Sequence, residues 1–154
     1  MRNMWRWLVI LLGVMIVAAA IALVMLIAAG RTGDLYNNRL KLAFNAAALD
    51  YAPGDPARTI VATHGGAQYE VDPDRYTQLS FYMRERAVGA YLPVRGAPDL
   101  TLVICDTDRA DIYRRGADGA TIVFTSAGKR MKVRAQGEGL WASILKAATG
   151  VAVN

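Results

Sequence analysis

The chain has 154 residues, of which 54% are apolar, and a formal net charge of +5. That length is enough for one compact domain. Arg2, Arg6 and Arg31 flank an apolar N-terminal stretch, which leaves 15 basic against 13 acidic residues from Asp34 onward. Acidic residues interrupt the basic ones there, so no long cationic block of the kind that binds a phosphate backbone is present, and we expect no nucleic-acid partner.

Residues 8–29 form an apolar run of 22 residues without a charge or a proline. As a helix the run is about 33 Å long, which matches a hydrocarbon core of about 30 Å. We therefore predict a transmembrane helix here, with the lipid bilayer as its partner and residues 1–7 as a short basic and aromatic tail. The residues expected at the membrane interface are Arg2, Trp5, Arg6 and Trp7.

A cleaved signal peptide is the alternative, because Ala28, Ala29 and Gly30 supply small residues after the apolar run. Signal peptides usually carry about 7 to 15 apolar residues, so the longer run favours a retained, single-pass signal anchor. Arg2 and Arg6 directly precede the run, which favours a cytoplasmic N-terminus and an extracytoplasmic domain at the cell membrane.

The soluble domain is expected at residues 34–154, after a juxtamembrane linker at residues 30–33 whose two glycines should break the helix. Asp34 is then a plausible N-cap of a second helix. Leu35, Leu42 and Leu49 repeat every seven residues in it, and three further residues widen its apolar side: Leu40, Phe44 and Ala47.

Residues 59–63 and 67–71 are typical of two strands joined at Gly65-Gly66, with Ala62 opposite Tyr69 and Ile60 opposite Val71. Asp72 and Pro73 then predict the cap and first turn of a helix that ends near Arg86. Its buried stripe is expected at Tyr76, Leu79, Tyr82 and Met83. Residues 87–99 are expected to form a loop.

Residues 100–105, 111–114 and 121–125 are typical of strands, and Ala127-Gly128 predicts a hairpin turn. The expected cross-strand pairs are Phe124 with Met131, Ile122 with Val133 and Ala120 with Ala135. Leu140 to Ala148 has helical spacing, with Gly150 as its C-cap. Strands that are neighbours in the sequence are therefore expected to pair as hairpins. This predicts an α+β fold with a largely antiparallel sheet and about three helices on one face.

An apolar strand that ends in Asp106-Thr107-Asp108 resembles, over residues 102–108, the nucleophile motif of haloacid-dehalogenase phosphatases. The resemblance implies a carboxylate nucleophile beside Mg²⁺. The 46 residues after Asp108 contain no second acidic pair for the metal, so a turn between two strands is favoured. Asp106, Asp108 and Asp111 lack the spacing of an EF-hand, and we expect no metal and no cofactor.

His64 and Cys105 are the single residues of their types. Nothing in the sequence positions His64 as a base for Ser126, Ser143 or Cys105, and the glycines after it explain it as a residue flanking a turn. Cys105 is the last residue of the apolar run 100–105 and is expected to be a buried thiol. We name no catalytic residue.

Arg130, Lys132 and Arg134 alternate along one face of the last predicted strand, where they are candidates for contact with an anionic surface. The leading hypothesis is a non-enzymatic, membrane-anchored domain that binds or positions a partner near the bilayer. A small membrane-tethered hydrolase and an accessory subunit of a membrane-protein complex are the alternatives.

Overall fold

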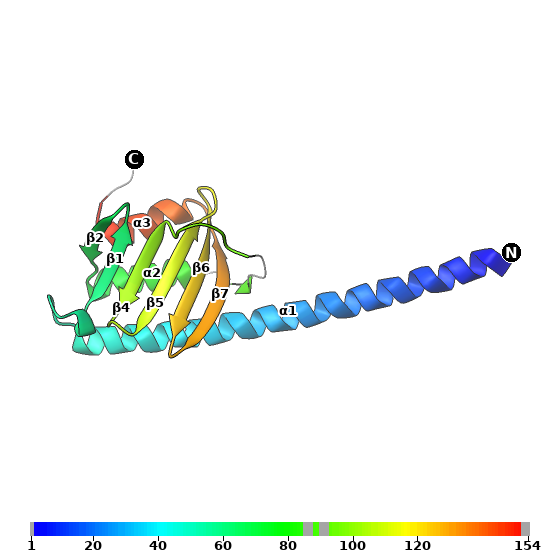
Figure 1. Ribbon diagram of the computed structural model, residues 1–154, viewed down its shortest axis with the longest axis horizontal. Coiled ribbons are helices and arrows are strands. Elements are labelled where there is room, and N and C mark those ends of the chain that lie inside the picture. The colour runs from blue at the N-terminus through cyan, green and yellow to red at the C-terminus, as the bar shows by residue number, and fades with distance from the viewer. Residues whose placement is uncertain (1, 85–87, 90–92, 152–154) are drawn as a thin grey trace.

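The computed structural model describes residues 2–84, 88–89 and 93–151. A long helix, α1 (Arg2–Asp50), projects from an α+β domain (Figure 1). The domain contains the short helix η1 (Pro56–Arg58) and the helices α2 (Pro73–Arg84) and α3 (Leu140–Thr149). Its strands are β1 (Ile60–His64), β2 (Ala67–Glu70), β3 (Val88–Gly89), β4 (Leu100–Ile104), β5 (Asp108–Arg114), β6 (Gly119–Ser126) and β7 (Lys129–Gln136).

Helix α1 runs without interruption through residues 30–33, so the predicted helix break was wrong. Asp34 lies inside the helix rather than at an N-cap. A glycine inside a helix costs about 1 kcal/mol relative to alanine, which is why the pair suggested a break. Gly33 is buried against the domain, and from there on the burial of Tyr36 and Leu40 stabilises the helical conformation.

The face of α1 that packs on the domain differs from the one expected. Tyr36, Leu40, Ala43 and Ala47 are buried, and Phe44 packs against the same core. Leu35 and Leu42 are 59% and 61% exposed on the other side of the helix, and the side chain of Leu49 lies outside the described part. Tyr36 explains the difference, because its ring inserts into the core and its hydroxyl lies 3.4 Å from the carbonyl oxygen of Met83.

All strands belong to one antiparallel sheet with the order β2-β1-β4-β5-β6-β7-β3. Both predicted hairpin registers are confirmed. Ala62 pairs with Tyr69, and Val71 N–H donates to the carbonyl oxygen of Ile60. The β6–β7 hairpin has the three predicted apolar pairs. Its turn residues, Ala127 and Gly128, have φ of +47° and +72°, as a two-residue hairpin turn requires.

The remaining differences concern strand limits. Strand β5 begins at Asp108, three residues earlier than expected, because β4 and β5 form a hairpin whose turn holds Cys105 and Asp106 at positive φ. Strand β3 lies within the predicted 87–99 loop. Helix α2 is described as far as Arg84, so an end near Arg86 falls outside the described residues.

The three long helices lie on one side of the sheet (Figure 1). α2 and α3 lie behind the strands, and α1 runs across the strand direction at one end of the sheet. The apolar residues that point to these helices form a single core, including Ile60, Leu102, Ile112, Ile122 and Phe124. The α+β fold with helices on one face is therefore as predicted. No helix in the described residues covers the other sheet face, which we call the open face.

Candidate membrane anchor and cationic sheet face

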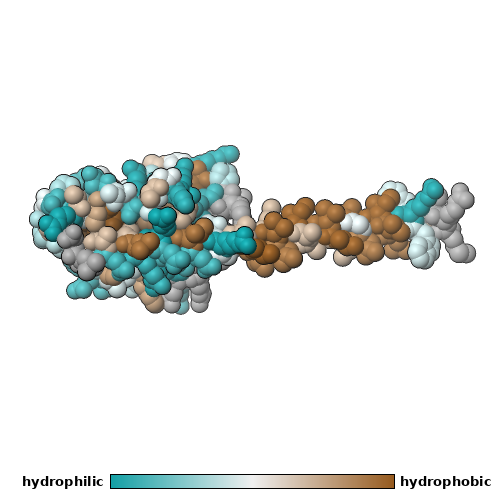
Figure 2. Space-filling view, turned by 90° about the horizontal axis from the view of Figure 1, so that it is seen from below, coloured by the Kyte–Doolittle hydropathy of each residue, from teal (hydrophilic) through white to brown (hydrophobic). Residues whose placement is uncertain are grey.

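The N-terminal half of α1 extends away from the domain as an apolar rod. Of the helices in the described residues, α1 is the one that is long and apolar enough to cross a membrane, and no part of its most apolar window is buried. Figure 2 shows this rod as an almost continuous apolar surface, with hydrophilic atoms at its far end and over the domain. A surface of this kind is unfavourable in water, so it needs lipid or an apolar partner.

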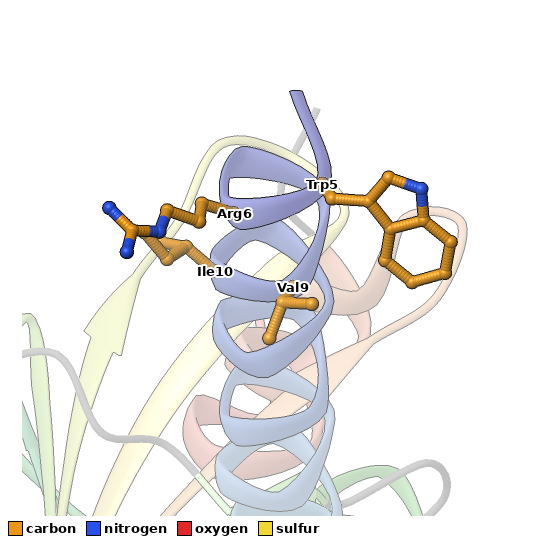
Figure 3. A pocket seen from close by; sticks show the side chains of 4 residues that line it. All are labelled: Trp5, Arg6, Val9 and Ile10. Carbon is orange, nitrogen blue, oxygen red and sulfur yellow. The ribbon is translucent and has the colours of Figure 1, made fainter. Parts of the chain in front are cut away.

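The far end of the rod carries the residues predicted at a membrane interface. Trp5 and Trp7 are 70% and 69% exposed. Figure 3 shows Trp5 and Arg6 extending in different directions from the N-terminal turns of α1, above Val9 and Ile10. Indole and guanidinium groups here can reach headgroups while the turns below lie in hydrocarbon. The side chain of Arg2 lies outside the described part.

The domain begins very close to the other end of the apolar run. Gly33 is buried against the domain, four residues after Ala29, which is about 6 Å along the helix axis. The headgroup region of one leaflet is about 5 to 7 Å deep. If residues 8–29 span a bilayer, the nearest side of the domain therefore lies at headgroup level.

The sheet order determines which strand occupies that near side. α1 contacts β3 and β7, and in Figure 1 β7 is the labelled strand closest to the projecting helix, whereas β2 is the most distant. At the distant edge, the hydroxyl of Tyr51 donates to Glu70 of β2. α1 thus crosses the sheet from the β7 side to the β2 side.

Arg130, Lys132 and Arg134 follow one another along the open face of β7, as the alternation predicted. Across the sheet, Arg130 pairs with Thr125, Lys132 with Val123 and Arg134 with Thr121. Val123 is only 2% exposed although it lies on the open face. Long cationic side chains can cover such a residue with their aliphatic parts and keep the charge in water.

Strand β5 and the residue that follows it widen this cationic surface with two arginines that the sequence did not indicate. Arg109 lies beside Thr125, opposite Arg130, and Arg115 donates through Nε to Thr121 Oγ1 at 3.3 Å. The missed signal was the alternation of Arg109, Asp111 and Tyr113, because the strand was predicted to begin only at Asp111. We call the open face of β5–β7, together with the adjoining Arg115, the cationic face; its basic residues are Arg109, Arg115, Arg130, Lys132 and Arg134.

Asp111 is the carboxylate that lies within the cationic face. Its Oδ1 accepts from Arg109 Nε at 2.8 Å and from Thr101 Oγ1 at 3.1 Å. Arg109 is therefore paired with a carboxylate within the sheet. The other basic residues of the cationic face lie mostly on β7, the strand nearest the projecting helix.

The residues weighed for catalysis are not brought together. His64 lies at the end of β1 that pairs with Leu100, whereas Cys105 and Asp106 form the turn beyond the opposite end of β4. His64 Nδ1 lies 2.7 Å from the Asp99 carbonyl oxygen, and Ser143 Oγ donates to Gly139 O. Asp106 and Thr107 lie in the turn between β4 and β5, and Asp108 is the first residue of β5. Among the described residues, no group of His, Cys, Asp and Glu is arranged to hold a metal ion.

No protein-family model, curated protein or solved structure matches the chain. A proposal for its function therefore depends on the geometry of the anchor helix and of the cationic face.

Proposed function

We propose that this protein is a single-pass, membrane-anchored and non-catalytic module that holds its cationic face against anionic lipid headgroups. The observation that carries the proposal is the unbroken helix α1, whose first half is an exposed apolar rod and whose second half is part of the domain core. Because anchor and core share one helix, the domain has a defined orientation relative to the bilayer.

The charge distribution supports headgroups as the binding partner. β7 carries its basic residues at the side of the domain that the anchor places nearest the bilayer. Each Lys or Arg near an anionic membrane surface contributes about 1 kcal/mol of attraction. Several such residues on one strand would bind the domain to the surface beyond the tethering by α1.

Two exposed glutamines provide a matched test of this orientation. Gln136 lies on β7 and Gln68 on β2, at opposite sides of the sheet. Each is replaced by cysteine in a Cys105→Ser background, labelled with bimane and placed in nanodiscs as the full chain. A spin label on the lipid headgroups should quench bimane at position 136 strongly and at position 68 weakly. Equal quenching at the two positions would contradict the proposed orientation.

The headgroup contact is tested by lipid composition. Adding phosphatidylglycerol to zwitterionic nanodiscs should increase quenching at position 136. The double variant Lys132→Glu/Arg134→Glu should abolish that increase. Its control, Arg58→Glu/Lys146→Glu, makes the same charge change on η1 and α3. This control should leave the increase in quenching intact. An increase that persists in the Lys132→Glu/Arg134→Glu variant would show that the cationic face does not bind the lipid.

The proposed topology has a cytoplasmic N-terminus and an extracytoplasmic domain, which the arginines before the apolar run support. A Gln78→Cys variant lacking Cys105 carries one thiol at an exposed position of α2. A membrane-impermeant maleimide should label it in intact cells. Labelling only after lysis would place the domain in the cytoplasm.

A further inference from the structure

Exposed residues repeat every seven positions along α1 and continue past the end of the apolar run. The first line consists of Val14, Ile21, Ala28, Leu35 and Leu42, and all of them are exposed. The line three residues further on is also exposed throughout, and consists of Val17, Val24, Arg31, Asn38 and Asn45. These two lines are the a and d positions of a heptad repeat, and together we call them the heptad stripe.

Lipid can cover the first part of the heptad stripe but not its end. Leu35 and Leu42 lie 6 and 13 residues beyond Ala29, about 9 and 20 Å along the helix axis. They are 59% and 61% exposed, and the domain packs on the other side of the helix through Tyr36 and Leu40. Figure 2 shows apolar patches on the domain surface in line with the projecting helix. A protein partner would cover these leucines.

We propose that this partner is α1 of a second copy of the chain, paired in parallel and in register along the heptad stripe. The parallel direction rests on the membrane anchorage proposed above, because two copies inserted in one bilayer point the same way. A repeat of seven residues gives a left-handed supercoil that keeps the same face toward an identical helix. The domains, which lie on the opposite side of each helix, would remain outside the pair.

The charges beside the stripe suit a parallel pair. Taking Leu35 and Leu42 as a positions, Asp34 is the g position of one heptad and Arg39 is the e position of the next. In a parallel coiled coil such g and e residues face each other across the two helices, so Asp34 of each copy meets Arg39 of the other. Beyond the apolar run, the d line is polar, with Arg31, Asn38 and Asn45. Polar residues at core positions of a coiled coil lower its stability.

Disulfide cross-linking of the full chain in membranes tests the pairing. In a Cys105→Ser background, Leu35→Cys and Leu42→Cys should each give a product of twice the chain mass, at least fivefold above the Gln78→Cys control. Gln78 is equally available on the surface but lies on α2. The product should contain two differently tagged copies when both are expressed together. No excess over the control, or a product containing another protein, would overturn the proposal.

Charge exchange tests the direction and register. Asp34→Arg or Arg39→Asp alone should lower cross-linking at Leu42→Cys about threefold or more, because each change places like charges opposite each other in both symmetry-related pairs. The double variant Asp34→Arg/Arg39→Asp should restore it. Failure of the double variant to restore cross-linking would exclude the parallel register. Alkaline extraction of the membranes separates the two proposals. Loss of the chain from the membrane pellet contradicts the anchorage, whereas the cross-linking and the charge exchange still test the pairing and its direction.

Discussion

The ring of Tyr36 meets the ring of Phe124 edge to face, with their centroids 5.8 Å apart. Tyr36 belongs to the anchor helix and Phe124 to a central strand, and both are fully buried. Edge-to-face aromatic pairs add about 0.5 to 1.5 kcal/mol beyond the apolar area that they bury. This contact therefore makes the second half of α1 a structural part of the domain core.

Replacing Tyr36 by alanine should destabilise the domain by about 3 kcal/mol or more, because it removes a large buried ring. The free energy of unfolding is measured by urea titration of the full chain in nanodiscs. Trp141 fluorescence is the signal, in a Trp5→Phe/Trp7→Phe background. Tyr36→Phe is the control: it keeps the ring, loses only the hydroxyl near Met83 O, and should cost less than about 1 kcal/mol. Similar losses for both variants would contradict this role of the ring.

Continuity of α1 at Gly30 should determine how the domain is oriented. Gly30→Pro removes a helical hydrogen bond and introduces a kink, at a cost of about 3 kcal/mol. Gly30→Ala is its control, because an added Cβ meets no atom within 4 Å there and alanine strengthens the helix by about 1 kcal/mol. The proline variant should lower the ratio of headgroup quenching at position 136 to that at position 68. The alanine variant should leave the ratio unchanged, and equal ratios in both would disprove the rigid connection.

The sequence predicted the sheet well because its hairpins are specified locally. Gly65-Gly66 and Ala127-Gly128 adopt the positive φ that such turns need, and apolar alternation then determines which residues pair. The limits of β5 were harder to predict, since its turn uses Cys105 and Asp106 at positive φ, where side chains other than glycine are unusual. Arg109 was missed as part of the cationic face for the same reason.

The continuity of α1 could not be predicted from local signals. Gly30, Gly33 and Asp34 together favour a break, and only packing against the sheet offsets them. The same packing determines which face of the helix is buried. The seven-residue repeat at Leu35 and Leu42 predicts the core face, but both leucines face outward. A repeat of apolar residues indicates an interface, but the sequence does not say whether the interface lies inside the domain.

The stability of α2 should depend on pH through Asp72. Arg75 N–H donates to Asp72 Oδ1 at 2.9 Å and Arg75 Nε donates to Oδ2 at 2.7 Å. The backbone bond first, and then the side-chain bond, lower the pKa of Asp72 below its ordinary value. The ionised form is therefore favoured by folding. Its contribution is complete above the unfolded pKa of about 3.9 and is lost as the pH falls through the lowered, folded pKa.

Replacing Asp72 by asparagine keeps an oxygen acceptor for the helix cap but removes the charge. The variant should be less stable than the parent at pH 6, and the difference should shrink as the pH falls below about 4. Urea titrations at several pH values provide the measurement. Asp74→Asn changes the same charge in the first turn of α2 and serves as the control. A difference between parent and Asp72→Asn that is independent of pH would exclude the ionised carboxylate as its cause.

Tyr76 provides a test of how much a buried hydroxyl in the core changes the stability of the domain. The centroid of its ring lies 5.5 Å from the centroid of the Phe44 ring, and its side chain is fully buried. Within the described residues, its hydroxyl has no hydrogen-bond partner, and burial raises its pKa well above the ordinary value near 10. A buried polar group without a partner costs about 1 to 3 kcal/mol. Tyr76→Phe should therefore leave the domain as stable as the parent or up to about 1 kcal/mol more stable.

Two further variants separate the hydroxyl of Tyr76 from its ring. Tyr76→Ala should cost about 3 kcal/mol or more, because it leaves a cavity between α1 and α2. Tyr82→Phe removes a hydroxyl from a half-buried position of the same helix and should change the free energy of unfolding by less than about 0.5 kcal/mol. A loss of 1 kcal/mol or more in Tyr76→Phe alone would show that this hydroxyl has a hydrogen-bond partner in the folded protein. In that case the contact between α1 and α2 would depend on a polar interaction as well as on packing.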